Sequence, residues 1–374
     1  MKAPVLTAYD TPLEIRDDIE IAPPGPGEVK VRVVASGVCH SDLSVLNGTI
    51  PLPTPIVLGH EGAGIVEELG DGVTSVAVGD HVVLSFVPAC GECYQCRHHQ
   101  AYLCEQSRAQ SSAGLLDRTT RLTSQGAPLH QMACLGTYGP YAIVPAISTV
   151  KIPDDVPLEI AALIGCGVLT GVGAAINTAT IARGDTVAVY GCGGVGLNVI
   201  QGARIAGATT IIAIDTLASK LEMAKEFGAT HTIDASTEDP VAAAAAVNGR
   251  GVDVAFEVIG LGATMEQAIK TARAGGEVVF VGVPRMDVTI ELNAAITWLY
   301  QAKTIKGCWY GSSNVYEDVP KLLELWRNGD LKLKELISQE IDVEHVNEAF
   351  ADMQAGTIAR SVIVHDHDHG RGDR

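Results

Sequence analysis

Four closely spaced cysteines form the pattern with the clearest chemistry in this sequence. Cys90, Cys93, Cys96 and Cys104 follow the spacing C-x2-C-x2-C-x7-C. Four thiolates at such spacing can close a tetrahedral shell around zinc, which leaves no position open for a substrate. An iron–sulfur ferredoxin pattern would instead place its last cysteine closer and follow it with proline. We therefore predict a structural zinc site, and not disulfides, at these cysteines.

Three further metal-ligand candidates stand in distant segments. Cys39 lies in GVCHSD at 37–42, His60 in GHEG at 59–62, and Cys166 in GCG at 165–167. Each alone is a weak signal, since a lone cysteine is more often a small packing residue. Together, two cysteines and a histidine can hold zinc with one position open, which a catalytic zinc site requires.

A glycine-rich stretch has the spacing of a dinucleotide-binding turn. Gly191, Gly193 and Gly196 form G-x-G-x-x-G, and they follow an apolar run at 186–190 and open a helical pattern. The first glycine permits the tight turn, the second lets the backbone approach a pyrophosphate, and the third lets the helix pack on the strand. The N-terminus of that helix would stabilise the phosphates.

An acidic residue follows the glycine turn at the distance that the fingerprint requires. Asp215 ends a second apolar run, about 20 residues further on. A carboxylate there accepts hydrogen bonds from the ribose hydroxyls of NAD and repels the 2′-phosphate of NADP. Lys220 lies nearby in sequence and could assist on the ribose. The sequence therefore predicts NAD as the cofactor.

The sequence around these motifs shows two kinds of secondary-structure pattern. Residues 1 to about 165 contain β-branched runs at 29–35, 64–69 and 81–86, which predict strands. The polar stretch 105–132 predicts a long loop. From residue 171, strand patterns at 186–190, 210–214, 252–258 and 277–281 alternate with helical patterns at 195–206, 219–227 and 264–274. This alternation predicts βαβ units and a parallel sheet. A helix at 319–326 and a strand at 359–364 are expected before a solvated tail from His365 onward.

Composition narrows the classes of partner. The chain has 374 residues, enough for two domains, with 47% hydrophobic and 19% charged residues. A net charge of −18 argues against binding to nucleic acid or to anionic membranes. We see no signal peptide and no apolar run long enough to span a bilayer. We therefore expect a cytoplasmic protein with neither nucleic acid nor membrane as a partner.

Taken together, these motifs resemble those of the zinc-containing medium-chain dehydrogenase/reductase family, in its long-form alcohol dehydrogenase branch. The resemblance runs from GPGEV at 25–29 to IARSV at 358–362. It implies an α/β protein with a β-rich, GroES-like catalytic domain at 1–167 and 310–374, which carries the structural zinc lobe at 88–106. It also implies a doubly wound Rossmann domain for NAD at 168–309.

The resemblance implies two zinc ions per subunit and an alcohol as the substrate. The catalytic zinc would be bound by Cys39, His60 and Cys166, with Glu61 beside it as a transient ligand, and Asp42 would orient His60. Zinc would act as a Lewis acid while a hydride passes between an alcohol and the nicotinamide, giving an aldehyde or ketone.

The resemblance also implies roles in proton transfer and cofactor binding. Ser41 would hydrogen-bond the substrate oxygen and take up its proton. In well-known members a histidine three residues further on relays this proton, but here the position is Ser44, so water, His40 or another route must serve. The implied cofactor contacts are His40 and Arg360 on the pyrophosphate, Thr170 and Val195 against the nicotinamide, and Gly194 within the glycine turn.

The substrate pocket is expected to be mostly apolar. Phe86 and Leu103 are candidate walls, and Ile50 and Ala109 are candidates to narrow or widen it, with core packing as the rival interpretation of each. The cysteines without a metal role, Cys134 and Cys308, are interpreted as packing residues, and Cys192 as a variable position of the glycine turn.

Three alternatives remain open. Arg108 matches a glutathione-dependent formaldehyde dehydrogenase of the same family, although Ile50 replaces an acidic residue expected there. A related enzyme could keep its nucleotide bound and pass hydride between two substrates. A non-enzymatic zinc and nucleotide protein is disfavoured, because such members typically lose zinc ligands. A homodimer or homotetramer, formed near 304–309, is expected from relatives.

Overall fold

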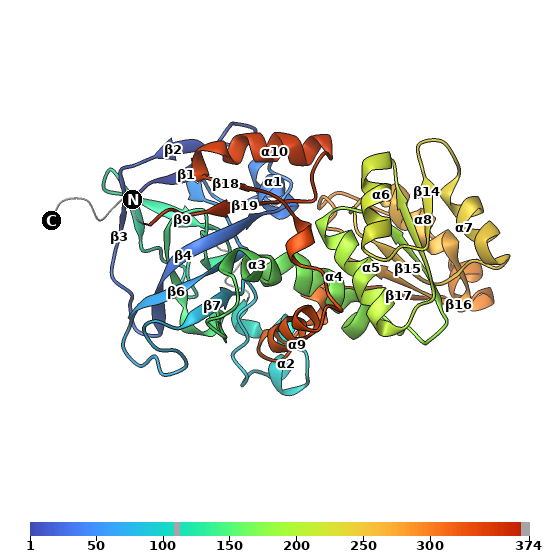
Figure 1. The fold of residues 1–374 in the computed structure, drawn as a ribbon, viewed down its shortest axis with the longest axis horizontal. Helices are drawn as coiled ribbons and strands as arrows, with labels where there is room; N and C mark the ends of the chain where they lie inside the picture. The colour runs from blue at the N-terminus through green and yellow to red at the C-terminus, as the bar shows by residue number, and fades with distance from the viewer. Residues whose placement is uncertain (108–112, 368–374) are drawn as a thin grey trace. The chain divides into compact units, whose positions relative to one another are not determined.

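The chain forms two units, labelled by element in Figure 1. The computed structural model describes residues 1–107 and 113–367. Unit 1 comprises Met1–Cys166, Asn314–Glu324 and Leu333–Arg374, and unit 2 comprises Gly167–Ser313 and Leu325–Lys332. The boundaries expected from sequence, at 167 and 310, lie next to two of these. The return of 325–332 to unit 2 has no counterpart in the sequence prediction.

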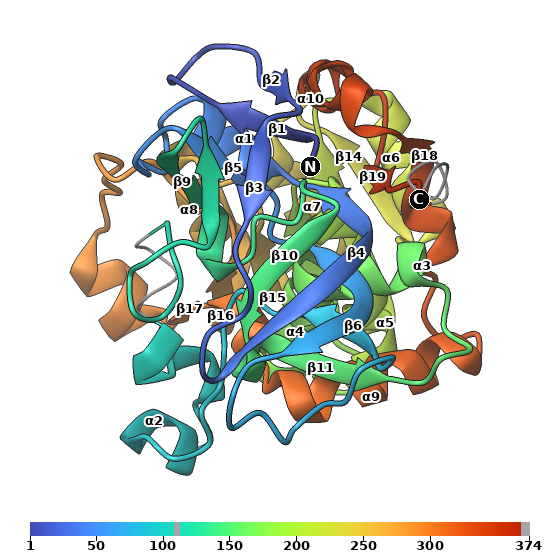
Figure 2. The ribbon, with the colours of Figure 1, turned by 90° about the vertical axis from the view of Figure 1, so that its left-hand side faces the viewer.

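Unit 1 is built around one long strand. β4 (Glu28–Val38) pairs antiparallel with β6 (Gly62–Leu69), β10 (Tyr141–Pro145) and β19 (Arg360–Val364), and Figure 2 shows β4 running alongside β6 and β10. Its burial alternates over its first half, as the period of a strand requires, and becomes continuous toward Val38. Cys39 directly follows β4, and His60 comes two residues before β6. Because Ser36 pairs with Gly62, these two residues lie at the same end of neighbouring strands.

Two sheets and several short helices complete unit 1. The strand orders are β2-β1-β5-β9-β8-β3 and β11-β7-β6-β4-β19-β18. The remaining strands are β1 (Ala3–Leu6), β2 (Glu14–Arg16), β3 (Ile19–Ile21), β5 (Ile56–Val57), β7 (His81–Leu84), β8 (Leu122–Ser124), β9 (Ala127–Gln131), β11 (Thr149–Ile152) and β18 (Ile337–Ile341). The helices are α1 (His40–Leu46), α2 (Tyr94–Arg97), η1 (Ala101–Leu103), η3 (Met132–Cys134), η4 (Ala146–Ser148), α3 (Leu158–Leu163), η9 (Lys334–Leu336), η10 (Val343–His345) and α10 (Val346–Ala355), with α9 (Val315–Arg327) continuing into unit 2.

The expected loop at 105–132 is wrong in its second half. β8 and β9 form a hairpin in which Leu122 pairs with Leu129, and both side chains are buried. Gln125 and Gly126 join the strands with φ of 52° and 75°, which is the backbone that a tight two-residue hairpin turn requires. The strands have only three and five residues, too few for sequence periodicity to reveal them.

Unit 2 contains a parallel sheet of doubly wound type. Its strands are β12 (Thr186–Tyr190), β13 (Thr210–Asp215), β14 (His231–Asp234), β15 (Val252–Glu257), β16 (Ala272–Phe280) and β17 (Thr304–Gly307), in the order β14-β13-β12-β15-β16-β17. All neighbours pair parallel. The strand order therefore reverses between β12 and β15, where open α/β sheets bind ligands.

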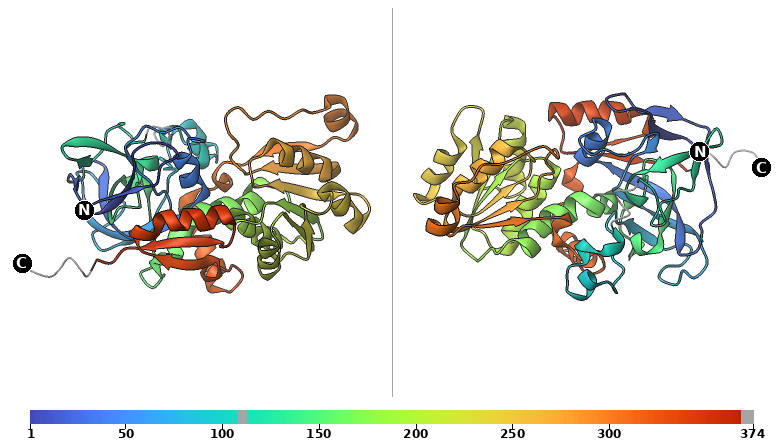
Figure 3. Two further views of the ribbon diagram at one scale, coloured as in Figure 1. Left: turned by 90° about the horizontal axis from the view of Figure 1, so that it is seen from above. Right: turned by 180° about the vertical axis from the view of Figure 1, so that it is seen from behind.

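Helices cover both faces of this sheet, as Figure 3 shows. They are α4 (Leu169–Gly173), η6 (Ala174–Thr178), α5 (Gly194–Ala206), α6 (Ala218–Glu226), α7 (Pro240–Asn248), α8 (Gly262–Thr271), η7 (Ala295–Tyr300) and η8 (Tyr310–Ser312), with η5 (Ile164–Val168) at the boundary between units. The α/β fold class is confirmed. One expectation was wrong in detail, since the helix expected to reach residue 274 ends at Thr271 and Ala272 already belongs to β16.

The tail is ordered further than expected. His365 donates its backbone N–H to Val34 O at 2.9 Å and is 9% exposed, and the His367 ring lies 2.8 Å from Val33 O. The expected solvated terminus at His365 is therefore wrong, because the chain continues along the edge of β4 after β19 ends. Residues 368–374 lie outside the described residues.

One segment is long and apolar enough to cross a membrane by length and composition alone. It spans Leu158–Thr178, and 83% of its most apolar window is buried inside the protein. Burial of that kind is the ordinary property of a core helix, so this segment adds no support for a membrane partner.

Candidate metal centres and nucleotide-binding turn

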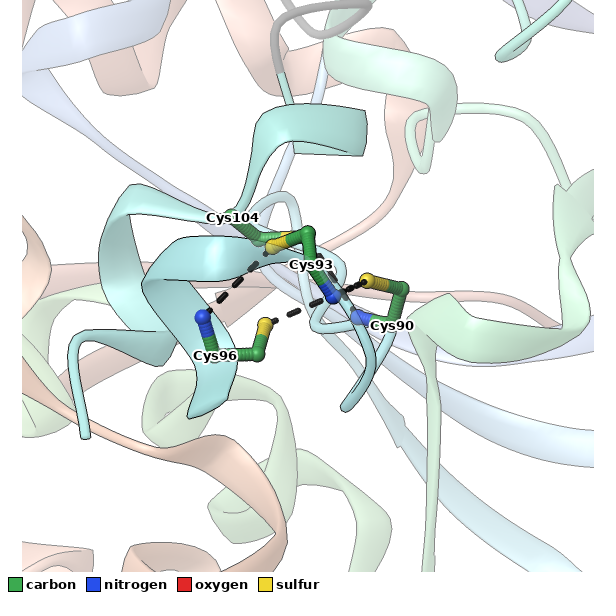
Figure 4. A group of neighbouring side chains, drawn as sticks. All are labelled: Cys90, Cys93, Cys96 and Cys104. Carbon is green, nitrogen blue, oxygen red and sulfur yellow. Dashed lines mark hydrogen bonds between the residues drawn. The ribbon is translucent and has the colours of Figure 1, made fainter. Parts of the chain in front are cut away.

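The four-cysteine lobe brings its sulfur atoms together. The Sγ atoms of Cys90 and Cys96 lie 4.0 Å apart, as do those of Cys93 and Cys104, and Figure 4 shows the four side chains converging. Tetrahedral zinc with Zn–S bonds of about 2.3 Å would hold its sulfurs about 3.8 Å apart. All nine cysteines are free, so the observed spacing fits a metal and not disulfides.

The backbone of the lobe is folded around these sulfurs. The N–H groups of Cys93 and Glu92 donate to Cys90 Sγ, and the N–H of Cys96 donates to Cys93 Sγ. Hydrogen bonds from the N–H groups of Glu105 and Cys96 lower the pKa of Cys93 to about 6. Burial and the neighbouring thiols raise the pKa of Cys96 to about 12. The raised pKa keeps Cys96 a thiol when no metal is bound, because neighbouring thiolates repel one another. A bound cation would stabilise all four sulfurs as thiolates.

The second group gathers ligands from three distant segments. Cys39, His60, Glu61 and Cys166 are buried, and one ligand atom of each lies within 4.8 Å of the others. The His60 Nδ1 lies 3.1 Å from Asp42 Oδ1, so the neutral form of the ring keeps its proton on Nδ1 and has a lone pair on Nε2 to offer a metal ion. Nε2 is buried and has no hydrogen-bond partner among the described residues. A metal ion would satisfy this atom, so the residues fit zinc.

The side chains of this group shift one another's pKa values. Burial lowers the pKa of His60, but the charge and hydrogen bond of Asp42, with help from Cys39, outweigh it and raise the value to about 10. The ring is therefore a cation at neutral pH when no metal is bound, and a bound zinc ion would take the place of the proton on Nε2. A hydrogen bond from Cys166, together with the charges of Arg360 and His60, holds the pKa of Cys39 well below its usual value despite burial. Such a site favours a cation at its centre.

Glu61 and Arg360 form a buried ion pair beside these ligands. Arg360 begins β19, which reaches the site because Ser361 pairs with Val38, one residue before Cys39. The resemblance implied that Arg360 contacts the pyrophosphate. In this structure Nη2 of its guanidinium pairs with Glu61, so a pyrophosphate contact would use the other N–H donors of the same group. Sequence reasoning missed this pair, since its members are 299 residues apart.

The expected proton-transfer residues occupy different surroundings. Ser41 Oγ accepts a hydrogen bond from Cys39 Sγ at 3.9 Å, so its hydroxyl stands beside a ligand. His40 is exposed at the start of α1, and the backbone carbonyl of Ser44 accepts from Ile50 N–H at 2.8 Å.

Of the expected pocket walls, Phe86 stands beside the metal ligands. Its ring meets that of His60 edge-on, with centroids 5.3 Å apart. Leu103 lies in the cysteine lobe with 43% of its surface exposed, and Ile50 packs against the core around β1 and α1. Arg108 and Ala109 lie outside the described residues. Cys134 and Cys192 are buried and Cys308 is half-buried, as packing residues would be.

The glycine turn has the backbone that its sequence requires. Gly191 has a φ of 96°, a left-handed conformation that favours glycine, and a Cβ there would stand 2.6 Å from Ile259 Cγ1. A Cβ at Gly196 would lie 1.9 Å from Gly191 O, so only glycine lets the helix pack this closely against the turn. Gly193, in contrast, faces open space, because a Cβ at this position would have no neighbouring atom within 4 Å. That space is where a pyrophosphate could approach the N-terminus of α5.

Asp215 ties the end of β13 to this turn. Its Oδ2 accepts a hydrogen bond from Cys192 N–H at 2.8 Å, and its Oδ1 accepts from the N–H groups of Thr216 and Leu217 at 2.8 and 3.1 Å. The carboxylate is thus held half-buried beside the turn. The other residues expected at the cofactor are half-buried in unit 2: Gly194 and Val195 in the first turn of α5, Lys220 in α6, and Thr170 in α4.

Comparison with known proteins agrees with this geometry. Residues 25–154 match the family model of the alcohol dehydrogenase GroES-like domain, and residues 194–327 match that of the zinc-binding dehydrogenase. A relative from Amycolatopsis methanolica, an NDMA-dependent alcohol dehydrogenase, is 39% identical and covers 98% of this chain and 99% of its own. The chain therefore belongs to the zinc-containing medium-chain dehydrogenase/reductase family, as its motifs predicted.

Solved structures support the same assignment. An alcohol dehydrogenase zinc-binding domain protein from Burkholderia ambifaria is 37% identical, with a TM-score of 0.92 and with coverage of 98% of this chain and 99% of its own. Benzyl alcohol dehydrogenase from Acinetobacter calcoaceticus is 33% identical, also with a TM-score of 0.92 and with coverage of 98% and 99%.

Proposed function

We propose that this chain is a zinc-dependent, NAD-linked alcohol dehydrogenase that converts a primary or secondary alcohol, aromatic alcohols included, to an aldehyde or ketone. The observation that carries the proposal is the buried group of Cys39, His60 and Cys166, with the unpartnered Nε2 of His60 facing it. The benzyl alcohol dehydrogenase among its relatives supports an aromatic substrate.

The protein's own residues hold and move the groups that react. Asp42 fixes the tautomer of His60. The Ser41 hydroxyl, which lies beside Cys39, would hydrogen-bond the alcohol and accept its proton while passing its own hydroxyl proton on toward solvent. When bound, zinc supplies Lewis-acid activation of the alcohol oxygen. Phe86 covers the imidazole edge-on and keeps that side of the site apolar.

The choice of NAD rests on Asp215. A carboxylate at the end of β13 suits the two ribose hydroxyls and repels a 2′-phosphate. Replacing Asp215 by Gly should raise the Kd for NADH and lower the preference for NADH over NADPH, measured by fluorescence titration. An unchanged preference would contradict this assignment.

Metal analysis tests the function directly. We expect the wild type to contain two zinc ions per subunit, and Cys39→Ala to contain one and to lose alcohol oxidation while keeping its fold and its affinity for NADH. Cys93→Ala is the matched variant in the other centre and should lose the other zinc. A wild type that binds a single zinc, retained in Cys39→Ala, would contradict a catalytic zinc.

A second candidate is an enzyme that keeps its nucleotide bound and passes hydride to a second substrate. It is favoured by the relative whose name states a dependence on NDMA. Protein purified without added nucleotide would then release nucleotide only on denaturation, and would oxidise alcohols with NDMA but not with added NAD. Turnover with free NAD would reject this candidate.

A further inference from the structure

Glu257 is a buried carboxylate that the proposed reaction does not use. It is the last residue of β15 and is 0% exposed. Its Oε1 accepts hydrogen bonds from the N–H groups of Ile259 and Gly260 at 3.0 and 2.8 Å, and from the Thr264 hydroxyl at 2.7 Å. Its Oε2 is buried and has no hydrogen-bond partner among the described residues.

Among residues 1–107 and 113–367, no cationic side chain pairs with this carboxylate. Two other carboxylates of these strands, Asp253 and Glu277, lie toward the opposite strand ends and pair with Arg273 and Lys306. Glu257, in contrast, has no ion pair within the described part of the chain. Burial raises the pKa of Glu257, and the hydrogen bonds from Thr264 and the loop N–H groups oppose that shift. Three donors around one oxygen stabilise the anion, so an uncompensated charge is held here at a cost to stability.

The charge stands at the crevice of the parallel sheet. Glu257 pairs in register with Tyr190, the residue before Gly191, and Val258 N–H donates to Tyr190 O at 2.9 Å. β12 and β15 are the two strands between which the strand order reverses. Dinucleotides bind across this point in doubly wound sheets.

The loop that Glu257 holds presents an apolar wall. Ile259, Leu261 and Val283 are 44%, 56% and 49% exposed. The loops after β15 and β16 touch closely, since a Cβ on Gly260 would lie 2.5 Å from Val283 O. The Ile259 side chain in turn approaches Gly191 of the nucleotide turn. These exposed apolar groups therefore border the same crevice.

The two halves of the sheet bind the two halves of a dinucleotide. Asp215 assigns the adenosine half to β12 and β13, so the nicotinamide half falls to the side that begins with β15. The oxidised nicotinamide ring carries a positive charge and the reduced ring carries none. We propose that Glu257 is a specificity-determining residue whose fixed negative charge stabilises the oxidised nicotinamide nucleotide relative to the reduced one, and so lowers the ratio Kd(NAD⁺)/Kd(NADH). This inference rests on the proposed function.

Binding measurements test it without reference to turnover. The Kd values of NAD⁺ and NADH would be measured by calorimetry for the wild type, Glu257→Gln and Glu238→Gln. Glu257→Gln keeps the shape and removes the charge, so the ratio Kd(NAD⁺)/Kd(NADH) should rise by about threefold or more. Glu238 is exposed in the same unit, and its variant should leave the ratio unchanged. Thr264→Val removes one donor, keeps the charge, and should shift both constants together.

The outcomes separate the two proposals. A wild type that binds neither nucleotide would overturn the proposed function. A wild type that binds both, with the same ratio in Glu257→Gln, would overturn the role of the charge alone. If Glu257→Gln does not fold, Glu257→Leu replaces it, since an apolar side chain of similar volume leaves no unpaired polar group. The same rise in the ratio is expected there.

Discussion

Asp42 makes three contacts beside the group formed by Cys39, His60 and Cys166 through one carboxylate. Besides the His60 ring, it accepts the backbone N–H of Cys39 at 3.1 Å and that of Gly59 at 2.9 Å. It therefore holds the imidazole and two backbone segments beside it in one arrangement. Partners that orient a ligating histidine in this way strengthen metal binding.

Removing the charge of Asp42 should weaken the metal site and leave the lobe intact. We expect Asp42→Asn to lower zinc affinity at Cys39, His60 and Cys166 by about 10- to 100-fold. The measurement is zinc release to a chelator, with the four-cysteine zinc as an internal reference. Asp154→Asn, an exposed change in the same unit, is the control. Equal release from Asp154→Asn and Asp42→Asn would contradict the orienting role.

At the scale of secondary-structure elements, the glycine turn between β12 and α5 shows how backbone conformation shapes a binding site. Gly191 is needed for its left-handed backbone, whereas Gly193 borders open space with nothing to clash. Gly191 is thus required by the backbone of the turn, whereas Gly193 leaves room for a ligand to approach.

The two glycines should respond differently to the same substitution. Gly191→Ala is expected to destabilise the protein by about 1–3 kcal/mol, because it strains the backbone and clashes with Ile259. Gly193→Ala should leave the Tm near the wild-type value and weaken NADH binding, because its methyl group fills the approach to the pyrophosphate. Thermal unfolding and fluorescence titration measure the two effects. A Gly193→Ala variant with normal affinity would be inconsistent with the nucleotide site.

The segment after β19 carries a buried histidine with a pH dependence of its own. Burial lowers the pKa of His365 to about 4 from its usual value of 6.5. The folded state therefore prefers the neutral ring, and its contribution to stability is complete above pH 6.5. That contribution is lost as pH falls from 6.5 toward 4.

Replacing His365 should make the protein less sensitive to acid. At pH 5 the protonation of His365 is expected to cost about 2 kcal/mol, which His365→Gln avoids while keeping a donor near Thr137 O. The drop in Tm between pH 7 and pH 5 should be smaller in His365→Gln than in the wild type. His231→Gln, at an exposed histidine, is the control. Equal drops in all three proteins would show that His365 does not titrate in this range.

At the scale of the whole molecule, unit 2 exposes an apolar edge. In η7, Trp298, Leu299 and Tyr300 are 50%, 74% and 77% exposed, and β17, which follows within a few residues, is the outermost strand of the sheet. An exposed apolar patch beside an unpaired strand edge is typical of a protein–protein interface. We therefore retain the proposal that a second copy of this chain pairs near 304–309.

Charges placed on this patch should separate the copies. The double variant Leu299→Glu and Tyr300→Glu is expected to sediment as a monomer, whereas the wild type sediments as a dimer or tetramer. Val78→Glu, which changes a 63% exposed residue of unit 1, should keep the wild-type mass. A double variant that keeps the wild-type mass would place the interface elsewhere.

Local sequence patterns were sufficient to predict much of the structure of this protein. The glycine turn, the strand before it and the cysteine lobe depend on residues close in sequence, so their spacing indicated their geometry. β12 and α5 begin and end within a residue of their predicted bounds. The resemblance to a known family supplied the set of Cys39, His60 and Cys166, since no spacing rule links three such distant segments.

Tertiary structure decided what depends on the pairing of distant segments. The ion pair of Glu61 with Arg360 exists because β19 lies beside β4, and His365 is buried because the tail follows the same edge. The burial of the Glu257 carboxylate follows from its place at the end of a central strand, β15, with β12 and β16 on either side. Strand register and burial are properties of the whole packed chain, and a residue's neighbours in sequence do not determine them.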